Sequence, residues 1–254
     1  MDFINKTILL TGASSGIGKA LAEKLSREKC KLILCSRRVD ILENFKNTNQ
    51  TIAEIFPFKC DVSNKEEVKN TYEKIKNEIG MLDIAILNAG VGHRMKVENF
   101  DSKLAEETFG VNIFGLIYWI ENIIPDFIKN RSGIIAGVSS LADNRGYSGS
   151  GFYCASKSAA TIFLEGLRVE LKPYGVKVIT IKPGFVKTPM TDKNEFKMPF
   201  LMSPEKAADI ILSGLRKEKR IIQFPLPTVI SSRLIGCLPS FLYEFMMTLY
   251  DKKK

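Results

Sequence analysis

Short apolar runs of strand length alternate with stretches of helical period along most of the chain, and this alternation limits the possible folds. We expect strands at Thr7–Leu10, Lys31–Cys35, Ile55–Phe58, Ile84–Leu87, Gly133–Val138, Val176–Ile181 and Ile221–Phe224. We expect helices near residues 16–29, through Leu42 and Phe45, and near 64–79, 102–129, 152–173 and 203–217. Such alternation implies βαβ crossovers and a parallel sheet covered on both faces. The sequence therefore predicts a doubly wound α/β domain, with ligands bound at the carboxyl ends of its strands.

Size and charge narrow the class of protein. The chain has 254 residues, near the upper limit for one hydrophobic core, so we expect residues 1–254 to form a single domain. Lys and Arg outnumber Asp and Glu by 37 to 28, which suits an anionic ligand. No basic run is interleaved with aromatic residues, so no nucleic-acid partner is expected. There is no room for a signal peptide before the first strand and no run of about 18 uncharged apolar residues, which together favour a cytoplasmic protein.

Cysteine and histidine usage argues against metal and disulfide chemistry. The five cysteines are scattered, odd in number and lack a C-x-x-C pair, so we expect reduced, mostly buried thiols. These are Cys30, Cys35, Cys60, Cys154 and Cys237. The single histidine, His93, leaves no basis for a His-based triad or a zinc site. No metal is expected.

A glycine-rich turn, Thr11-Gly-Ala-Ser-Ser-Gly-Ile-Gly18, joins the first strand to the first helix. Gly12 permits a tight turn, Gly16 lets the backbone approach a pyrophosphate, and Gly18 lets the helix pack closely on the strand. The N-terminus of the helix then offers free N–H groups and a partial positive charge to phosphates. The turn therefore predicts a dinucleotide site.

Tyr153 and Lys157 are four positions apart on an expected helix, so their side chains share one face. A free tyrosine has a pKa of about 10, which is too high for a base near neutral pH. A neighbouring ammonium group stabilises the phenolate and thereby lowers that pKa. The pair is a candidate acid/base unit.

Four segments, taken together, resemble the short-chain dehydrogenase/reductase family in order and spacing. They are Thr11–Gly18, Asn88-Ala89-Gly90, Tyr153-Cys-Ala-Ser-Lys157 and Pro183-Gly184, and the resemblance spans roughly residues 5–225. It implies a Rossmann-type sheet of about seven strands, a nicotinamide dinucleotide and, usually, a homodimer or homotetramer. The family's frequent ending, with a final Asp-Gly-Gly, is absent, which argues against a ketoacyl carrier-protein reductase.

The resemblance also implies roles for individual residues. The catalytic set would be Asn112, Ser140, Tyr153 and Lys157, with Ser140 selected over Ser139 because it lies 13 positions before the tyrosine. In the family, Asn112 holds a water that links Lys157 to solvent. The cofactor would contact Gly12, Ser14, Ser15, Gly16, Ile17, Gly18, Arg37, Arg38, Asp61, Val62, Asn88, Ala89, Gly90, Tyr153, Lys157, Pro183, Gly184, Val186 and Thr188.

The end of the second strand indicates which dinucleotide binds. NAD-binding sites use a carboxylate about 20 residues past the glycines to hold the ribose 2′-hydroxyl. Here the strand ends in Ser36-Arg37-Arg38, and the first acid, Asp40, lies inside the next expected helix. Guanidinium groups favour a 2′-phosphate through charge and forked geometry. We therefore expect NADP(H).

A lid is expected at residues 189–202, over the substrate. It contains Met190, Phe196, Met198, Phe200 and Met202, which could serve a greasy substrate or fill the core. His93 follows a strand's carboxyl end and could overhang the substrate or lie exposed in a loop.

The tail at residues 228–250 is strongly apolar. Residues 221–250 carry only two charges, Arg233 and Glu244, and Pro239 should split the tail into two short helices. The tail could cover the substrate pocket, with the 189–202 lid as the nearest cover, pack in a dimer, or lie on a membrane with Lys252–Lys254 on the headgroups.

Two classes of function remain open at this stage. The first is an oxidoreductase that transfers a hydride between NADP(H) and a ketone, an aldehyde or a secondary alcohol of lipid-like or bulky apolar character. The second is a non-catalytic NADP(H)-binding sensor or scaffold. The complete set Asn112, Ser140, Tyr153 and Lys157 favours the enzyme, because a binding protein has no need of it.

Overall fold

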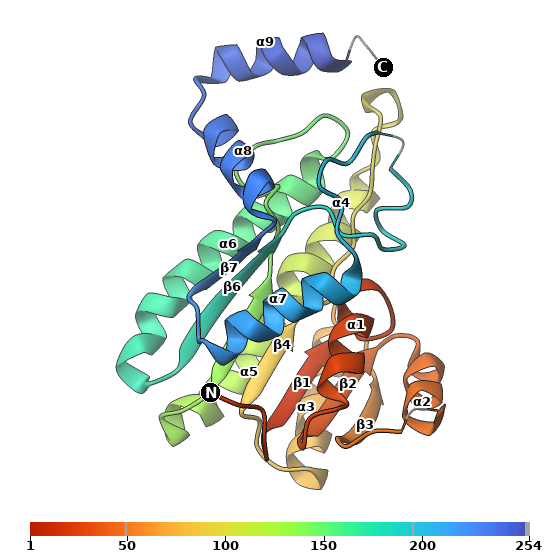
Figure 1. The fold of residues 1–254 in the computed structure, drawn as a ribbon, viewed down its shortest axis with the longest axis vertical. Helices are drawn as coiled ribbons and strands as arrows, with labels where there is room; N and C mark the ends of the chain where they lie inside the picture. Colours follow the sequence, from red (N-terminus) through yellow and green to blue (C-terminus); the bar gives the residue numbers. More distant parts are fainter. Residues whose placement is uncertain (49, 195, 252–254) are drawn as a thin grey trace.

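The computed structural model describes residues 1–48, 50–194 and 196–251. Within them, seven strands form one parallel sheet in the order β3-β2-β1-β4-β5-β6-β7 (Figure 1). The strands are β1 (Thr7–Thr11), β2 (Lys31–Ser36), β3 (Glu54–Lys59), β4 (Ile84–Leu87), β5 (Ile134–Val138), β6 (Lys177–Pro183) and β7 (Ile221–Phe224). The expected doubly wound sheet is confirmed.

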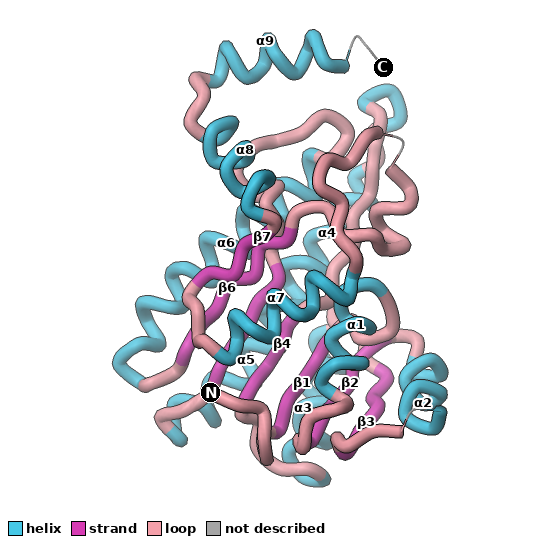
Figure 2. The backbone as a smooth tube through the Cα atoms, in the orientation of Figure 1, coloured by secondary structure: helices cyan, strands magenta, loops and turns pink. Residues whose placement is uncertain are grey.

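Helices cover both faces of the sheet (Figure 2). On one face pack α1 (Gly16–Leu25), α2 (Val39–Thr48) and α7 (Pro204–Arg216). On the other pack α3 (Lys65–Glu78), α5 (Gly115–Asn130) and α6 (Gly151–Leu171), and α4 (Ser102–Phe109) lies beside α6. The chain ends in α8 (Leu226–Gly236) and α9 (Ser240–Asp251).

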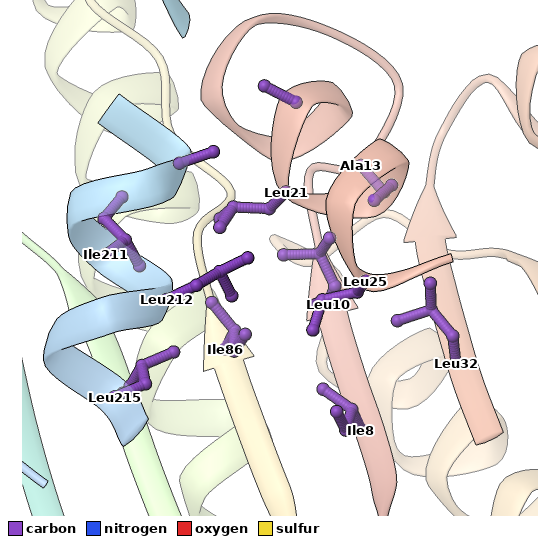
Figure 3. Packing of buried hydrophobic residues seen from close by; sticks show 14 of the residues in the cluster. Ile8, Leu10, Ala13, Leu21, Leu25, Leu32, Ile86, Ile211, Leu212 and Leu215 are labelled. Carbon is purple, nitrogen blue, oxygen red and sulfur yellow. The ribbon is translucent and has the colours of Figure 1, made fainter. Parts of the chain in front are cut away.

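Both faces of the central strands are apolar, which explains why two helical layers are needed. Along β1, Ile8 and Leu10 face one layer and Leu9 faces the other, because successive side chains on a strand point to opposite sides. Figure 3 shows Leu10 packed among Leu21 and Leu25 of α1, with the leucines of α7 beside them. All these side chains are fully or almost fully buried.

The strand order places the site. From β1 the chain moves outward through β2 and β3, then returns to β4 on the other side of β1. The carboxyl ends of β1 and β4 therefore flank the point where the direction of winding reverses, which is where such sheets bind ligands. The glycine turn after β1 and the Asn88–Gly90 segment after β4 meet there.

Several expected boundaries change in the folded chain. The expected helix at 16–29 ends at Leu25, and its final residues turn back toward β2. The expected helix at 102–129 is interrupted by a π-helical turn, η2 (Gly110–Phe114). A π turn inserts a residue into the helical repeat and is frequent at functional sites. Here it carries Asn112.

The helical run from Ser102 to Asn130 is the candidate membrane span among the described residues, by length and composition. Half of the most apolar 18-residue stretch of this helical run is buried within the protein. That burial is typical of a core helix, which passes the same test of length and hydropathy.

The tail forms the two expected helices, and α9 begins directly after Pro239. The expectation that the lid at 189–202 covers the tail is wrong. The polar contacts of α8 and the buried ring of Tyr243 go instead to residues 141–147, and much of the apolar surface of both helices stays exposed.

Candidate active site

The turn after β1 brings backbone from two strand ends together. Gly12 has a φ of +67°, and a Cβ there would lie 2.8 Å from the Cα of Ala89. A Cβ on Gly18 would lie 2.1 Å from the Gly12 carbonyl oxygen. Only glycine allows both the left-handed turn and this close packing of α1 on β1. The expected roles of Gly12 and Gly18 match these contacts.

The first turn of α1 faces the same cleft. Ser15 occupies the N-cap position, but its hydroxyl makes no capping hydrogen bond. Backbone N–H groups at a helix N-terminus that lack a cap can bind an anion, and the helix dipole favours negative charge there. This arrangement fits a pyrophosphate.

Thr11 joins β1 to β4, a role that the sequence analysis missed. Its buried hydroxyl accepts hydrogen bonds from the backbone N–H groups of Asn88 and Ala89, both at 3.0 Å. The Asn88 amide donates in return to the carbonyl oxygen of Thr11, also at 3.0 Å. The available signal was a polar residue at the carboxyl end of a strand whose three middle residues are apolar.

One cavity of about 550 Å³ gathers the expected residues. Its lining includes every residue expected to contact the cofactor, from the glycine turn to Thr188, together with Ser140. It also includes residues that sequence reasoning did not place there as contacts, among them Ser36, Val91, Gly92, Glu107, Pro189 and Thr191. Asn112 lies behind this wall rather than on it.

Two arginines and three serines meet where β2 ends. The Arg38 guanidinium donates to the hydroxyls of Ser14 at 2.9 Å and Ser15 at 3.0 Å, and the Ser36 hydroxyl donates to Ser14 at 2.8 Å. The Arg37 guanidinium, which is largely exposed, lies 4.0 Å from the Asp61 carboxylate. Arg37 and Arg38 thus present positive charge at the end of the cavity where the adenosine ribose of a dinucleotide would lie.

Ser140, Tyr153 and Lys157 converge on the cavity wall beyond β5. Ser140 follows β5, and its hydroxyl forms a hydrogen bond with that of Tyr153. The Lys157 ammonium lies 5.8 Å from the centre of the Tyr153 ring and donates to the Val138 carbonyl at 2.9 Å. Helix α6 positions both residues, because four positions make slightly more than one turn.

Asn112 supports this group from the π turn. Its side-chain oxygen accepts from the Val91 N–H at 2.8 Å, and its amide donates to the Val91 carbonyl at 3.0 Å and to Ser156 at 2.9 Å. A Cβ on Gly90 would lie 3.3 Å from the Asn112 oxygen and 3.4 Å from the Lys157 nitrogen. Asn112 therefore fixes the segment between β4 and α4 (residues 88–101, the β4 loop) next to Lys157. Its expected part in a water relay stays a prediction.

The family follows from a comparison over most of the chain. A family model described as short chain dehydrogenase matches residues 6–198. The chain belongs to the short-chain dehydrogenase family. An uncharacterized oxidoreductase of Myxococcus xanthus (strain DK1622) is 32% identical, over 94% of this chain and 95% of that protein. The NADP-dependent 3-hydroxy acid dehydrogenase of Schizosaccharomyces pombe is 31% identical, over 85% of this chain and 89% of that protein.

A solved structure gives the same result. The alcohol dehydrogenase from Thermococcus sibiricus, complexed with 5-hydroxy-NADP, superposes with a TM-score of 0.77 at 26% identity. The match covers 86% of this chain and 94% of that one. Sequence and structure thus agree that this short-chain dehydrogenase is an oxidoreductase with a Rossmann-type fold.

Burial dominates the titration of the two central residues. Burial raises the pKa of Tyr153, the hydrogen bond with Ser140 offsets part of that rise, and electrostatic interactions with Cys154 and Asp143 add to it. Burial also lowers the pKa of Lys157 to about 8. The chain's own groups thus move the Tyr153 pKa opposite to the expected lowering, because desolvation of the phenolate is the largest effect.

A buried polar network lies behind the site. The Asp143 carboxylate pairs with Lys182 at 2.8 Å and accepts from the Thr161 hydroxyl at 2.5 Å. The hydroxyl of Thr161 lies 2.7 Å from that of Ser139, which donates to the Lys157 carbonyl at 2.8 Å. Ser139 thus ties the end of β5 to α6, and it also lines the cavity. The sequence did not reveal Asp143 and Lys182, because they are 39 positions apart.

The lid residues divide between the cavity and the core. Met190 lines the cavity beside Gly92 and Tyr153, whereas Met202 is buried and pairs with Val186. Phe196 packs on Phe185 and beneath the Arg94 guanidinium. Met202 therefore fills the core, whereas Met190 is placed to contact a substrate, and its role for a greasy substrate stays a prediction.

His93 lines the cavity and is not an exposed loop residue. Its Nε2 lies 3.0 Å from a carboxylate oxygen of Glu107, without the angles of a hydrogen bond. Across the described ranges, no three His, Cys, Asp or Glu side chains gather closely enough to hold a metal ion. All five cysteines are free, and Cys237 alone is exposed.

Proposed function

We propose that this short-chain dehydrogenase is NADP(H)-dependent and interconverts a ketone or aldehyde with a secondary or primary alcohol, using Tyr153 as proton donor and acceptor. One observation carries the proposal: Ser140, Tyr153 and Lys157 meet on the wall of the cavity that the dinucleotide-binding residues also line. A reacting group held there would touch the phenol and the nicotinamide end of the cavity together.

The chain's residues supply binding and proton transfer. When bound, the nicotinamide supplies the hydride that adds to the carbonyl carbon. The Tyr153 hydroxyl donates its proton to the carbonyl oxygen, and the Ser140 hydroxyl stabilises the charge that develops there. In the reverse direction the phenolate accepts the alcohol proton. With its pKa lowered to about 8, Lys157 exchanges its proton readily near neutral pH and can reprotonate the phenolate.

The preference for NADP(H) rests on the charges at the end of β2. Arg37 and Arg38 line the cavity there, and the acid of α2, Asp40, does not. Asp61 and Glu107 are the acids among the described lining residues, and Asp61 already faces Arg37. The name of the Schizosaccharomyces relative and the ligand of the Thermococcus structure are consistent with this preference.

The proposed substrate class is supported by the apolar residues that line the cavity beside Tyr153. Met190 stands beside Tyr153, and Val91 and Pro189 line the same cavity. A flexible thioether adapts to varied apolar groups. We therefore propose that the substrate is a lipid-like or bulky apolar carbonyl compound.

The test is a panel of ketones, aldehydes and alcohols, assayed by NADPH absorbance with wild type and Tyr153→Phe. Removing the proton donor should lower kcat by about 10²–10⁴-fold, while NADPH affinity stays unchanged because the ring still packs. Tyr147→Phe is the matched control, since this half-buried tyrosine lies outside the cavity lining.

Two results would contradict the proposal. If Tyr153→Phe keeps activity within a few-fold of wild type, another group is the acid. If wild type binds NADPH but turns over no compound of the panel, the chain is the binding protein that the sequence analysis left open.

A further inference from the structure

The two C-terminal helices carry an apolar stripe that no other part of the described chain covers. On α8, Leu226, Ile230 and Leu234 are 70%, 52% and 67% exposed and lie four positions apart, so they share one face. On α9 the exposed side chains are Phe241, Leu242, Phe245, Met246 and Leu249. Phe241 and Phe245 are 75% and 61% exposed. We call these eight residues the apolar stripe.

The opposite faces of both helices hold them to the protein. The Asn144 amide donates to the carbonyl and hydroxyl oxygens of Ser232, and the Ser232 hydroxyl donates to the Leu141 carbonyl. The Arg145 guanidinium donates to the last carbonyl groups of α8 and to Leu238. The Tyr243 hydroxyl donates to the Gly146 carbonyl at 2.8 Å. The helices are therefore anchored with the apolar stripe pointing outward.

The apolar stripe belongs to a rim around the cavity. Tyr243 of α9 stacks edge-on with Tyr147, and the loop that holds Tyr147 bonds the β4 loop through Gly149 and Met95. In turn, Arg94 of the β4 loop covers Phe196 of the lid. These segments follow β5, β4 and β6, so they share the end of the sheet where the cavity lies (Figure 1).

Further exposed apolar side chains lie on this rim. Val97 and Phe100 of the β4 loop are 77% and 65% exposed, and Phe200 and Leu201 of the lid are 59% and 44% exposed. Exposed apolar side chains that gather at one end of a soluble protein are typical of an interaction surface. A partner that covered them would lie beyond the cavity end of the sheet.

The charges of the tail fit a lipid surface. Between Leu234 and Tyr250 the sequence carries one charge, Glu244, and after Asp251 it ends in Lys252, Lys253 and Lys254. An interfacial helix places its apolar face among the acyl chains, while lysines contact anionic headgroups. The net charge of +9 favours the same approach. A rigid protein partner across this rim would close the cavity, whereas a lipid surface would leave it accessible to apolar molecules.

We infer that the apolar stripe of α8 and α9 docks this oxidoreductase on a membrane surface that contains anionic lipid, with the cavity facing the bilayer. Apolar substrates then reach the cavity from the lipid rather than from water. This inference concerns a surface of the protein, and it stands whether or not the proposed cofactor preference holds.

Vesicle flotation of the full-length protein tests it. Wild type should float with vesicles of phosphatidylcholine and phosphatidylglycerol, and less with phosphatidylcholine alone. The double variant Phe241→Glu/Phe245→Glu should lose binding by about tenfold or more, because two apolar contacts become charged. Ile52→Glu is the matched control: this residue is 68% exposed but precedes β3, at the other end of the sheet, and should float like wild type.

Light scattering without lipid, and a thermal melt of each variant, complete the experiment. An unchanged melt shows that the glutamates leave the fold intact, as expected for exposed positions. The inference is overturned if wild type stays unbound with anionic vesicles, or if the double variant binds as well as the Ile52→Glu control. One form of this negative result identifies the occupant. If wild type does not float and is an oligomer by light scattering, whereas the double variant is a monomer, a second copy of the chain covers the apolar stripe.

Discussion

The buried pair of Asp143 and Lys182 provides a quantitative test of how the site is held. The Asp143 side chain is 3% exposed, the Lys182 side chain 19%, and their charged atoms are 2.8 Å apart. Lys182→Met leaves the carboxylate buried without its counterion. Such losses cost about 3–5 kcal/mol, and we expect the lower end because Thr161 still donates to the carboxylate.

The double variant separates the pair from its parts. Asp143→Asn/Lys182→Met removes both charges and keeps similar volumes, so it should be more stable than Lys182→Met alone. The coupling free energy should be about 2 kcal/mol. Urea unfolding can be followed by the fluorescence of Trp119, the single tryptophan, which is fully buried. Lys177→Met, which breaks an exposed pair with Glu218, is the control and should cost at most about 1 kcal/mol.

The pH dependence of activity shows whether Asp143 acts on Tyr153 as well as on the stability of the fold. The Asp143 charge raises the pKa of Tyr153, so Asp143→Asn should lower that pKa. The rising limb of alcohol oxidation against pH, which reports loss of the phenol proton, should then move to lower pH. Two results would contradict these roles: Lys182→Met no more destabilising than Lys177→Met, or a limb that stays in place in a folded Asp143→Asn variant.

Three further predictions concern the cofactor, the site lysine and assembly. Wild type should bind NADPH more tightly than NADH. Arg37→Ala should weaken NADPH binding by about tenfold or more, since a charged phosphate contact contributes about 1.5–3 kcal/mol. Equal affinities of wild type for NADPH and NADH in a fluorescence titration would refute this. Because burial lowers the pKa of Lys157 from 10.5 to about 8, its contribution to stability is complete above pH 10.5 and is lost as pH falls through about 8. The unfolding free energy of wild type should therefore rise by about 3 kcal/mol between pH 7 and 10.5 relative to Lys157→Met, and a constant difference would show that the lysine is not desolvated. Light scattering at micromolar concentration should give a dimer or tetramer, and Ile162→Glu on the exposed face of α6 should dissociate it, whereas a wild-type monomer would contradict the expected assembly.

The sequence determined the elements and most of the site, because their signals are local. Short apolar runs of strand length placed β4 and β7 at their observed limits. The glycines of the first turn are needed for backbone geometry within eight residues, and Tyr153 and Lys157 share a face through one helical turn. Since the carboxyl ends of parallel strands lie at one edge, residues that follow different strands could be expected to meet there.

The tertiary structure decided what depends on distant residues. The π turn around Asn112 interrupts a pattern that looked like one helix, and the bonds of Asn112 to Val91 and Ser156 join three segments. The Asp143–Lys182 pair exists because β5 and β6 are neighbours, which no local window contains. Desolvation likewise set the direction of the Tyr153 pKa. The spacing of residues along the sequence predicted which groups lie near this phenol. Its pKa depends instead on how much water the folded chain removes from around it.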